Sequence, residues 1–242
     1  MLNKIFLNLL TIVIGLIDYS NKRLIIFFLK KKFKNQYLNI IDIGSHKGET
    51  INLFLKNFNI QKIFAFETNI ALFNVLVKKK YNNKKIKFFN CGVGLNEEHL
   101  NLNIMIDSSS STFNSINKES DYYKKKNKII TFLSNKKNLI ENKQKISVVN
   151  LSKIIQENKI DKIDVLKIDT EGFEYNILRG IKEIDYEKIR YIYFEHHYDL
   201  MIEKGYTFSN INSLLVKNNF KKIFKIKMKF RKSFEYIYEK KV

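Results

Sequence analysis

The chain has 242 residues, 45% of them hydrophobic, which is enough for one α/β domain with a full core and too few for two. It carries 44 Lys and Arg against 24 Asp and Glu, a formal net charge of +20, yet it lacks Pro and Trp and is rich in Lys, Ile, Asn and Phe. Because this bias is typical of A/T-rich coding, the charge alone is a weak indication of a nucleic-acid partner. The single cysteine excludes an intrachain disulfide and is typical of a reducing compartment.

Residues 1–36 are predicted to form an apolar and basic helical arm, ahead of one domain over residues 37–242. Ile5 to Ile17 is apolar but falls short of the roughly 20 residues that span a bilayer, and no cleavage site of the signal-peptide kind follows it. Leu24 to Leu29 is also apolar and runs into a lysine cluster at residues 30–34, as in interfacial membrane anchors. Two interpretations stay open: the arm binds an anionic membrane surface, or it forms two helices that pack on the domain.

The stretch from Ile40 to Glu49 predicts a strand, a glycine turn and the start of a helix. Ile40 to Ile43 has the apolar, β-branched character of a strand buried on both faces of a parallel sheet. The glycines allow the backbone to bend sharply and to approach a ligand closely, and the amides of the following helix point into the same crevice. This pattern is typical of a nucleotide-type cofactor site. Its candidate residues are Asp42, Gly44, Ser45, His46 and Gly48.

A second apolar strand, Ile63 to Phe66, ends in Glu67, about twenty residues past the glycine turn, where an acid can accept the hydroxyl hydrogens of a ribose. A dinucleotide site would have a further glycine where His46 stands, so a pyrophosphate would gain less backbone contact here. The pattern therefore favours S-adenosylmethionine, which has a ribose and a carboxylate but no pyrophosphate, over NAD.

A third strand is predicted over Ile86 to Phe89, followed by Asn90 and Cys91. Because no histidine lies near Cys91 in the sequence, we interpret this cysteine as a packing residue and not as a nucleophile. His99 to Ile106 alternates as a strand does. The serine cluster from Ser108 to Thr112 predicts a polar loop that could serve as a lid or as a wall on the substrate side.

The region between Ser108 and Lys145 contains no motif that identifies an acceptor, although we expect acceptor specificity to lie there. Asp121 to Asn127 is highly charged and predicts a mobile segment. Val148 to Leu151 predicts a short strand, and Ser152 to Asn158 predicts a helix with a polar cap.

Polar side chains follow two further predicted strands, Ile163 to Ile168 and Tyr191 to Phe194. These polar residues are Asp169, Glu171, Glu195, His196 and His197. Because the carboxyl ends of parallel strands meet at one edge of a sheet, the acids are expected to lie there together with Glu67. Such acids repel one another unless a cation, a metal or a substrate contact uses them.

The end of the chain predicts a helix over Phe208 to Lys217 and two strands, Lys221 to Ile226 and Phe234 to Tyr238. Two consecutive strands with a short connection are typical of an antiparallel hairpin. The predicted fold class is therefore α/β, with a mostly parallel, Rossmann-like sheet of seven strands, an antiparallel C-terminal hairpin and the N-terminal helical arm.

Across about residues 38 to 200 the chain resembles the FkbM family of S-adenosylmethionine-dependent methyltransferases. Thr68 stands where the family often has Pro, and Leu151-Ser152 stands where it often has Leu-Asp, but neither change touches the glycine turn. The resemblance is carried by Ile41 to Gly48, Phe66-Glu67, the serine cluster before Phe113, Leu166 to Glu174 and Leu178 to Gly180.

The resemblance implies a class I methyltransferase fold and methyl transfer to a hydroxyl of a sugar, glycolipid or related natural product, with a small molecule or a glycan as acceptor. It also implies that Asn90 and Cys91 lie beside the adenine. Methyl transfer requires an aligned acceptor oxygen and help in removing its proton. The candidate catalytic residues are Asp169, Glu195 and His196.

Two mechanisms stay open. Asp169 and Glu195 could hold Mg²⁺ and so lower the pKa of the acceptor hydroxyl, or His196 or His197 could act as a general base without a metal. The competing functions are a non-enzymatic, basic nucleic-acid-binding protein and a methyltransferase of nucleic acid. We expect a cytoplasmic enzyme, which would work at the inner membrane face if the arm binds an anionic membrane surface.

Overall fold

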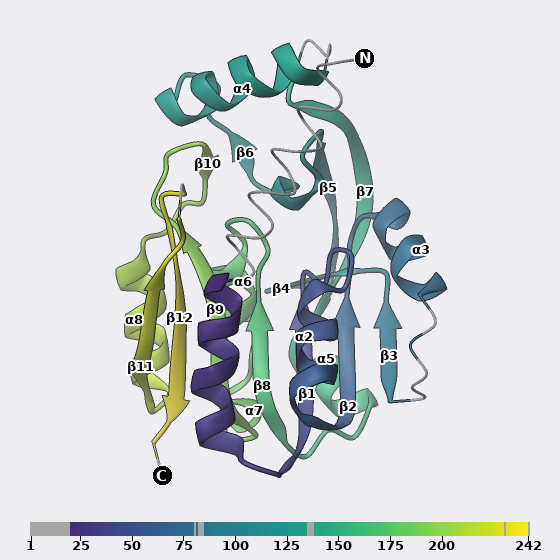
Figure 1. Ribbon diagram of the computed structural model, residues 1–242, viewed down its shortest axis with the longest axis vertical. Coiled ribbons are helices and arrows are strands. Elements are labelled where there is room, and N and C mark those ends of the chain that lie inside the picture. Colours follow the sequence, from purple (N-terminus) through teal and green to yellow (C-terminus); the bar gives the residue numbers. More distant parts are fainter. Residues whose placement is uncertain (1–19, 80, 82–84, 135–137, 230, 242) are drawn as a thin grey trace.

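The computed structural model describes residues 20–79, 81, 85–134, 138–229 and 231–241. The apolar stretch Ile5 to Ile17, the first half of the predicted arm, lies outside the described residues. The described part has a central sheet covered by helices on both faces, with a smaller strand layer beyond one edge of the sheet (Figure 1).

The central sheet has seven strands in the order β11-β12-β9-β8-β1-β2-β3. The last strand, β12, runs antiparallel to both of its neighbours, and the other neighbouring strands are parallel. This arrangement confirms the predicted mostly parallel sheet with an antiparallel C-terminal hairpin. The strands are β1 (Tyr37–Ile43), β2 (Asn59–Phe66), β3 (Ile86–Phe89), β8 (Ile163–Ile168), β9 (Ile189–His197), β11 (Phe220–Lys227) and β12 (Ser233–Lys240).

The two strands that the sequence marks most clearly, β1 and β8, lie side by side at the centre. Ile40 pairs with Val165 and Ile43 pairs with Ile168 in parallel register. All six residues of β8 are buried, because helices cover both faces of the sheet. The most continuous apolar strands therefore lie at the topological switch point, between β1 and β8. Open α/β sheets bind their ligands at this point.

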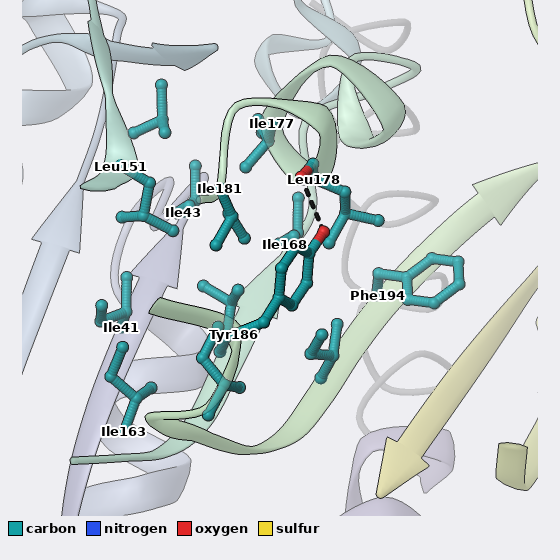
Figure 2. Close-up of a cluster of buried hydrophobic side chains, with 14 of the residues drawn as sticks. Ile41, Ile43, Leu151, Ile163, Ile168, Ile177, Leu178, Ile181, Tyr186 and Phe194 are labelled. Carbon is teal, nitrogen blue, oxygen red and sulfur yellow. Dashed lines mark hydrogen bonds between the residues drawn. The ribbon is translucent and has the colours of Figure 1, made fainter. Parts of the chain in front are cut away.

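Helices on each face complete two hydrophobic clusters. One cluster joins the sheet to residues 20–33, α2 (Glu49–Asn57) and α3 (Ile70–Lys78). The other, part of which Figure 2 shows, joins the opposite face to the remaining helices of the domain. In it the Tyr186 hydroxyl donates a hydrogen bond of 2.7 Å to the Leu178 carbonyl, so the buried phenol is satisfied. Those helices are α5 (Leu151–Glu157), α6 (Glu174–Arg179), α7 (Glu183–Tyr186) and α8 (Phe208–Lys217).

A second, smaller layer lies beyond the carboxyl ends of the central strands, with α4 (Asp121–Ser134) at its outer side (Figure 1). The remaining elements of the domain are β4 (Gly92–Gly94), β5 (Glu98–Met105), the 3-10 turn η1 (Ser108–Ser110), β6 (Ser115–Ile116), β7 (Ile140–Asn150) and β10 (Ile202–Glu203). Strands β4, β7 and β5 form one sheet, and β6 pairs with β10.

The local pattern missed two features of this layer. Asp121 to Asn127, which the sequence predicts as a mobile segment, forms the first half of the helix α4, and Tyr123 in it is buried in a small core. The predicted short strand from Val148 is the end of the long strand β7, whose pairing with β5 the local pattern does not reveal.

The second half of the predicted arm, residues 20–33, is a helix that packs on the domain. Ile25, Leu29 and Phe33 are fully buried in the same cluster as β1. Among the described residues, no helix is both long enough and apolar enough to cross a membrane.

Candidate active site

The turn after β1 needs glycine for two reasons. Gly44 has a φ of 82°, in the left-handed region, and an added Cβ would lie 1.9 Å from the backbone oxygen of Asp169. Gly48 has a φ of 81°, and His46 between them has a φ of 49°. The carboxyl ends of β1 and β8 therefore approach each other so closely that only a residue without a side chain fits at position 44.

Glu67 lies at the end of β2, directly against this turn. Its carboxylate accepts a hydrogen bond of 2.7 Å from the His46 amide and one of 2.8 Å from the Asn69 amide. Burial raises the pKa of Glu67, although the two amides act against that shift. The acid thus joins the ends of β1 and β2, and its remaining acceptor positions suit ribose hydroxyls.

Asn90 and Cys91 follow β3 beside this acid. The Asn90 side-chain amide donates 2.8 Å and 3.2 Å hydrogen bonds to the carbonyls of Glu67 and Thr68. Cys91 packs against the main core, and burial raises the pKa of its thiol to about 11, so the thiol is neutral at physiological pH. The geometry agrees with a packing role for Cys91 and with Asn90 as a support for the end of β2.

Asp42 and Ser45 lie beneath the turn and not on its surface. Both are buried, and the Ser45 hydroxyl donates to the Asp42 carbonyl. Asp42 pairs at 3.1 Å with the ammonium group of Lys167, which also donates to the Gly44 carbonyl and lies 3.4 Å from Asp169. The sequence analysis did not identify Lys167. Its position was a usable signal of a buried ion pair, because β8 is otherwise almost entirely apolar and β1 carries one acid.

A contact between His46 and Ser108 links the turn to the outer layer. His46 Nε2 lies 2.9 Å from Ser108 Oγ, and Nδ1 lies 3.3 Å from Glu49. The 3-10 turn that begins at Ser108 is held in place by Asp107, whose carboxylate accepts hydrogen bonds from Ser109 and Ser110. The serine cluster therefore contacts the glycine turn through Ser108.

The turn after β8 is held by Glu174 and not by the two acids before it. Glu174 Oε1 accepts hydrogen bonds from the Thr170 amide and hydroxyl and from the Gly172 amide, while Oε2 accepts from the Tyr206 hydroxyl. The carboxylates of Asp169 and Glu171 therefore do not hold this turn, and their contacts lie elsewhere in the site.

His197 stands at the centre of a buried cluster of carboxylates. Its Nε2 lies 3.3 Å from Glu171 and 3.6 Å from Glu195, and its Nδ1 lies 3.5 Å from Asp199. Burial lowers the pKa of His197, but Glu171 and Glu195 raise it more, to about 10, so the ring is an imidazolium at neutral pH.

Glu171 and Asp169 differ in charge state within this site. Burial, Glu195 and Asp169 together raise the pKa of Glu171 to about 7 against the opposing effect of His197. Burial also acts to raise the pKa of Asp169, but Lys167 lowers it to about 2. At pH 7 Glu171 can therefore both accept and release a proton, whereas Asp169 stays ionised.

His196 is not part of this cluster. Because side chains alternate along β9, its ring points to the opposite face, where it packs on Tyr198, Tyr206 and Phe208. Burial and, to a smaller extent, Lys204 lower its pKa to about 3, so it is neutral. The structure brings together Asp169, Glu195 and His197, and it leaves His196 in an aromatic packing environment.

Glu235, on β12, was not identified from the sequence. It lies directly opposite Glu195 in the antiparallel register, is buried, and accepts a hydrogen bond of 2.8 Å from the Tyr193 hydroxyl. Burial, with Glu195 as a second cause, raises its pKa to about 8. Nothing near Glu235 in the sequence marks it, because only the pairing of β12 with β9 brings it to the site.

A metal site is not formed by these acids. The described residues contain no group of three or more His, Cys, Asp and Glu side chains that could hold a metal ion. Asp169 is paired with Lys167 and Glu195 with His197, so a cation would have to compete with two positive groups.

The seven-stranded, mostly parallel sheet and its strand order define the class I methyltransferase fold of the Rossmann-like type. Residues 42–222 match the family described as the methyltransferase FkbM domain. The chain therefore belongs to that family, which confirms the resemblance drawn from the sequence.

Solved structures agree at the level of the fold. Methyltransferase FkbM from Methylobacillus flagellatus KT is 16% identical with a TM-score of 0.51, and the match covers 84% of this chain but only 44% of that one. Magnesium protoporphyrin IX methyltransferase from Synechocystis PCC 6803, solved with S-adenosylhomocysteine, is 9% identical with a TM-score of 0.53, covering 94% and 85% of the two chains. No significant match is found among curated protein sequences.

Proposed function

We propose that this protein transfers a methyl group from S-adenosylmethionine to a hydroxyl of a sugar, glycolipid or related natural product. The observation that carries the proposal is the position of the buried Glu171–His197 pair at the strand ends next to the glycine turn. Family membership supports the methyl-transfer chemistry. The acceptor we favour is a sugar of a cell-surface glycan or of a lipid-linked precursor.

The residues present fit this cofactor. Gly44 lets the end of β8 pack directly against the turn, and Glu67 stands at the end of the next strand, where an acid can accept ribose hydroxyls. When bound, S-adenosylmethionine supplies a methyl group on a positively charged sulfur, which an acceptor oxygen displaces. The chain's own part is to bind the ribose with Glu67 beside the glycine turn, and to enclose the site with the turn that begins at Ser108.

Glu171 is the group we assign to the acceptor proton. A carboxylate with a pKa near 7 can take the proton of a bound hydroxyl at physiological pH, and the adjacent imidazolium of His197 stabilises its ionised form. His197 is a positioning residue in this mechanism, because it already carries its proton. Asp169, with a side chain that is 23% exposed, is the most accessible acid of this set and orients the bound reactants.

Binding of the cofactor is expected to raise the melting temperature, and Glu67→Ala is expected to remove most of that rise. At about 100 times its dissociation constant, a ligand stabilises the folded state by about 2.7 kcal/mol. For a chain of this size that is a shift of roughly 5–10 °C by thermal unfolding. Glu98→Ala, at an exposed position on β5, is the control and should keep the full shift. Stabilisation by NAD and not by S-adenosylmethionine would contradict the cofactor assignment.

The reaction itself is tested with labelled S-adenosylmethionine and a fractionated extract of the source cells, followed by mass spectrometry of the labelled fraction. We expect label in glycan or glycolipid and none with the Asp169→Ala variant. Label confined to RNA or protein would overturn the proposed acceptor class. Because the acids are already paired with Lys167 and His197, activity is expected to survive a chelator. Loss of activity that Mg²⁺ restores would instead support the metal mechanism.

A further inference from the structure

The helix formed by residues 20–33 has a buried face and an outward face of opposite character. Its buried face packs on the sheet through Ile25, Leu29 and Phe33. The outward face recurs at intervals of three and four residues and is exposed along its whole length. The exposed side chains of this face, continued by the lysine after the helix, are Arg23, Leu24, Phe27, Lys30, Lys31 and Lys34.

This outward face combines cations with large apolar groups. Phe27 is 59% exposed and Leu24 is 53% exposed. The Lys31 ammonium lies 4.4 Å from the centroid of the Phe27 ring. Between residues 20 and 34 the sequence contains no Asp or Glu, so no acid on this segment neutralises the cations.

A shallow groove extends the same surface onto α2, with a volume of about 370 Å³. Its walls combine cationic ends with apolar side chains and one amide. The residues that line it are Arg23, Ile26, Phe27, Lys30, Leu53, Lys56 and Asn57. This combination complements a phospholipid, whose anionic headgroup and acyl chain require neighbouring cationic and apolar surfaces.

We propose that the outward face of residues 20–34, together with the α2 side of this groove, docks on an anionic phospholipid bilayer. Exposed Leu24 and Phe27 favour a bilayer over nucleic acid, since a phosphate backbone would contact the lysines but offer no partner for these side chains. The apolar stretch Ile5 to Ile17, which precedes the helix in the sequence, adds apolar residues to the same end of the chain.

If the acceptor is lipid-linked, as the proposed function has it, docking would bring the site to its substrate. The helix begins near the carboxyl edge of the sheet, since Lys22 is close enough to help lower the pKa of Asp169. Membrane docking requires neither cofactor nor acceptor. The docking proposal and the proposed methyl transfer can therefore be tested independently of each other.

The test is sedimentation of the full-length protein with vesicles. With about 30% phosphatidylglycerol in phosphatidylcholine at about 0.1 M salt, most of the protein should sediment, with far less bound to pure phosphatidylcholine or at about 0.5 M salt. The double variant Lys30→Glu/Lys31→Glu should weaken binding to anionic vesicles by at least about tenfold. Lys143→Glu/Lys145→Glu changes the net charge equally at exposed positions on β7 and should bind like the unmodified protein.

A second pair of variants tests the apolar contribution. Phe27→Ala should weaken vesicle binding several-fold, whereas Phe132→Ala should not, although Phe132 on α4 is 70% exposed. Equal losses from the two charge-reversed variants would show that only net charge matters and would overturn the proposal. Vesicle binding unaffected by Lys30→Glu/Lys31→Glu, or a loss confined to polynucleotide binding, would overturn it as well. Unchanged melting temperatures would show that the variants remain folded.

Discussion

Replacing Glu171 with glutamine is expected to lower kcat by about a hundredfold or more, because general-base catalysis by a positioned side chain contributes roughly 10²–10⁴ in rate. Glutamine keeps the shape of Glu171 but cannot take a proton. It also removes a negative partner of His197, so the melting temperature should be measured alongside activity. Methyl transfer to the identified acceptor, followed by mass spectrometry, is the direct measurement.

The pH dependence distinguishes a base from a merely structural residue. Since the pKa of Glu171 is raised to about 7, kcat/KM of the unmodified enzyme should rise with pH up to about 7 and then level off. His197 keeps its proton until about pH 10, so its titration should cause no second change in kcat/KM below that pH. The rise should be absent in Glu171→Gln and present in Glu203→Gln, an exposed control on β10. A Glu171→Gln variant that retains both full activity and the rise near pH 7 would place the base elsewhere.

Gly44→Ala is expected to destabilise the protein by about 2–5 kcal/mol. A left-handed φ costs an L residue roughly 1–2 kcal/mol, and overpacking adds about 1–3 kcal/mol because the new Cβ would meet the Asp169 carbonyl. The melting temperature should fall by roughly 5–15 °C, with loss of the stabilisation by S-adenosylmethionine. Urea unfolding measures the first effect and the thermal shift measures the second.

Gly205→Ala separates the two contributions. Gly205 has a φ of 69°, but an added Cβ would meet no atom within 4 Å. This variant should therefore lose only about 1 kcal/mol and keep its cofactor response. Equal losses from Gly44→Ala and Gly205→Ala would mean that the approach of β1 and β8 does not constrain the turn.

Interpretation of the sequence was most successful where one short segment carries the whole signal. The turn from Gly44 to Gly48 and the acid Glu67 could be placed because each lies at the end of an apolar strand, and local backbone geometry determines the conformation of the turn. The place of β1 inside a parallel sheet was also predicted, since Ile40 to Ile43 is apolar enough to require burial on two faces, and β1 pairs in parallel with β2 and β8. By contrast, the α4 helix was missed because its first half is highly charged and Tyr123 in it is buried only by contacts with distant residues.

The sequence by itself determined the fold class, the glycine turn and the acids Glu67, Asp169, Glu171 and Glu195 at the strand ends, because the apolar strands and the residues that follow them are local patterns. Only the tertiary structure decided which histidine faces the site. Side chains alternate along β9, so a shift of one residue exchanges His196 for His197, and the register with neighbouring strands settles that choice. The same register places Glu235 opposite Glu195, and the pairing of β1 with β8 sets Lys167 beside Asp42, which are long-range contacts that a local pattern cannot specify.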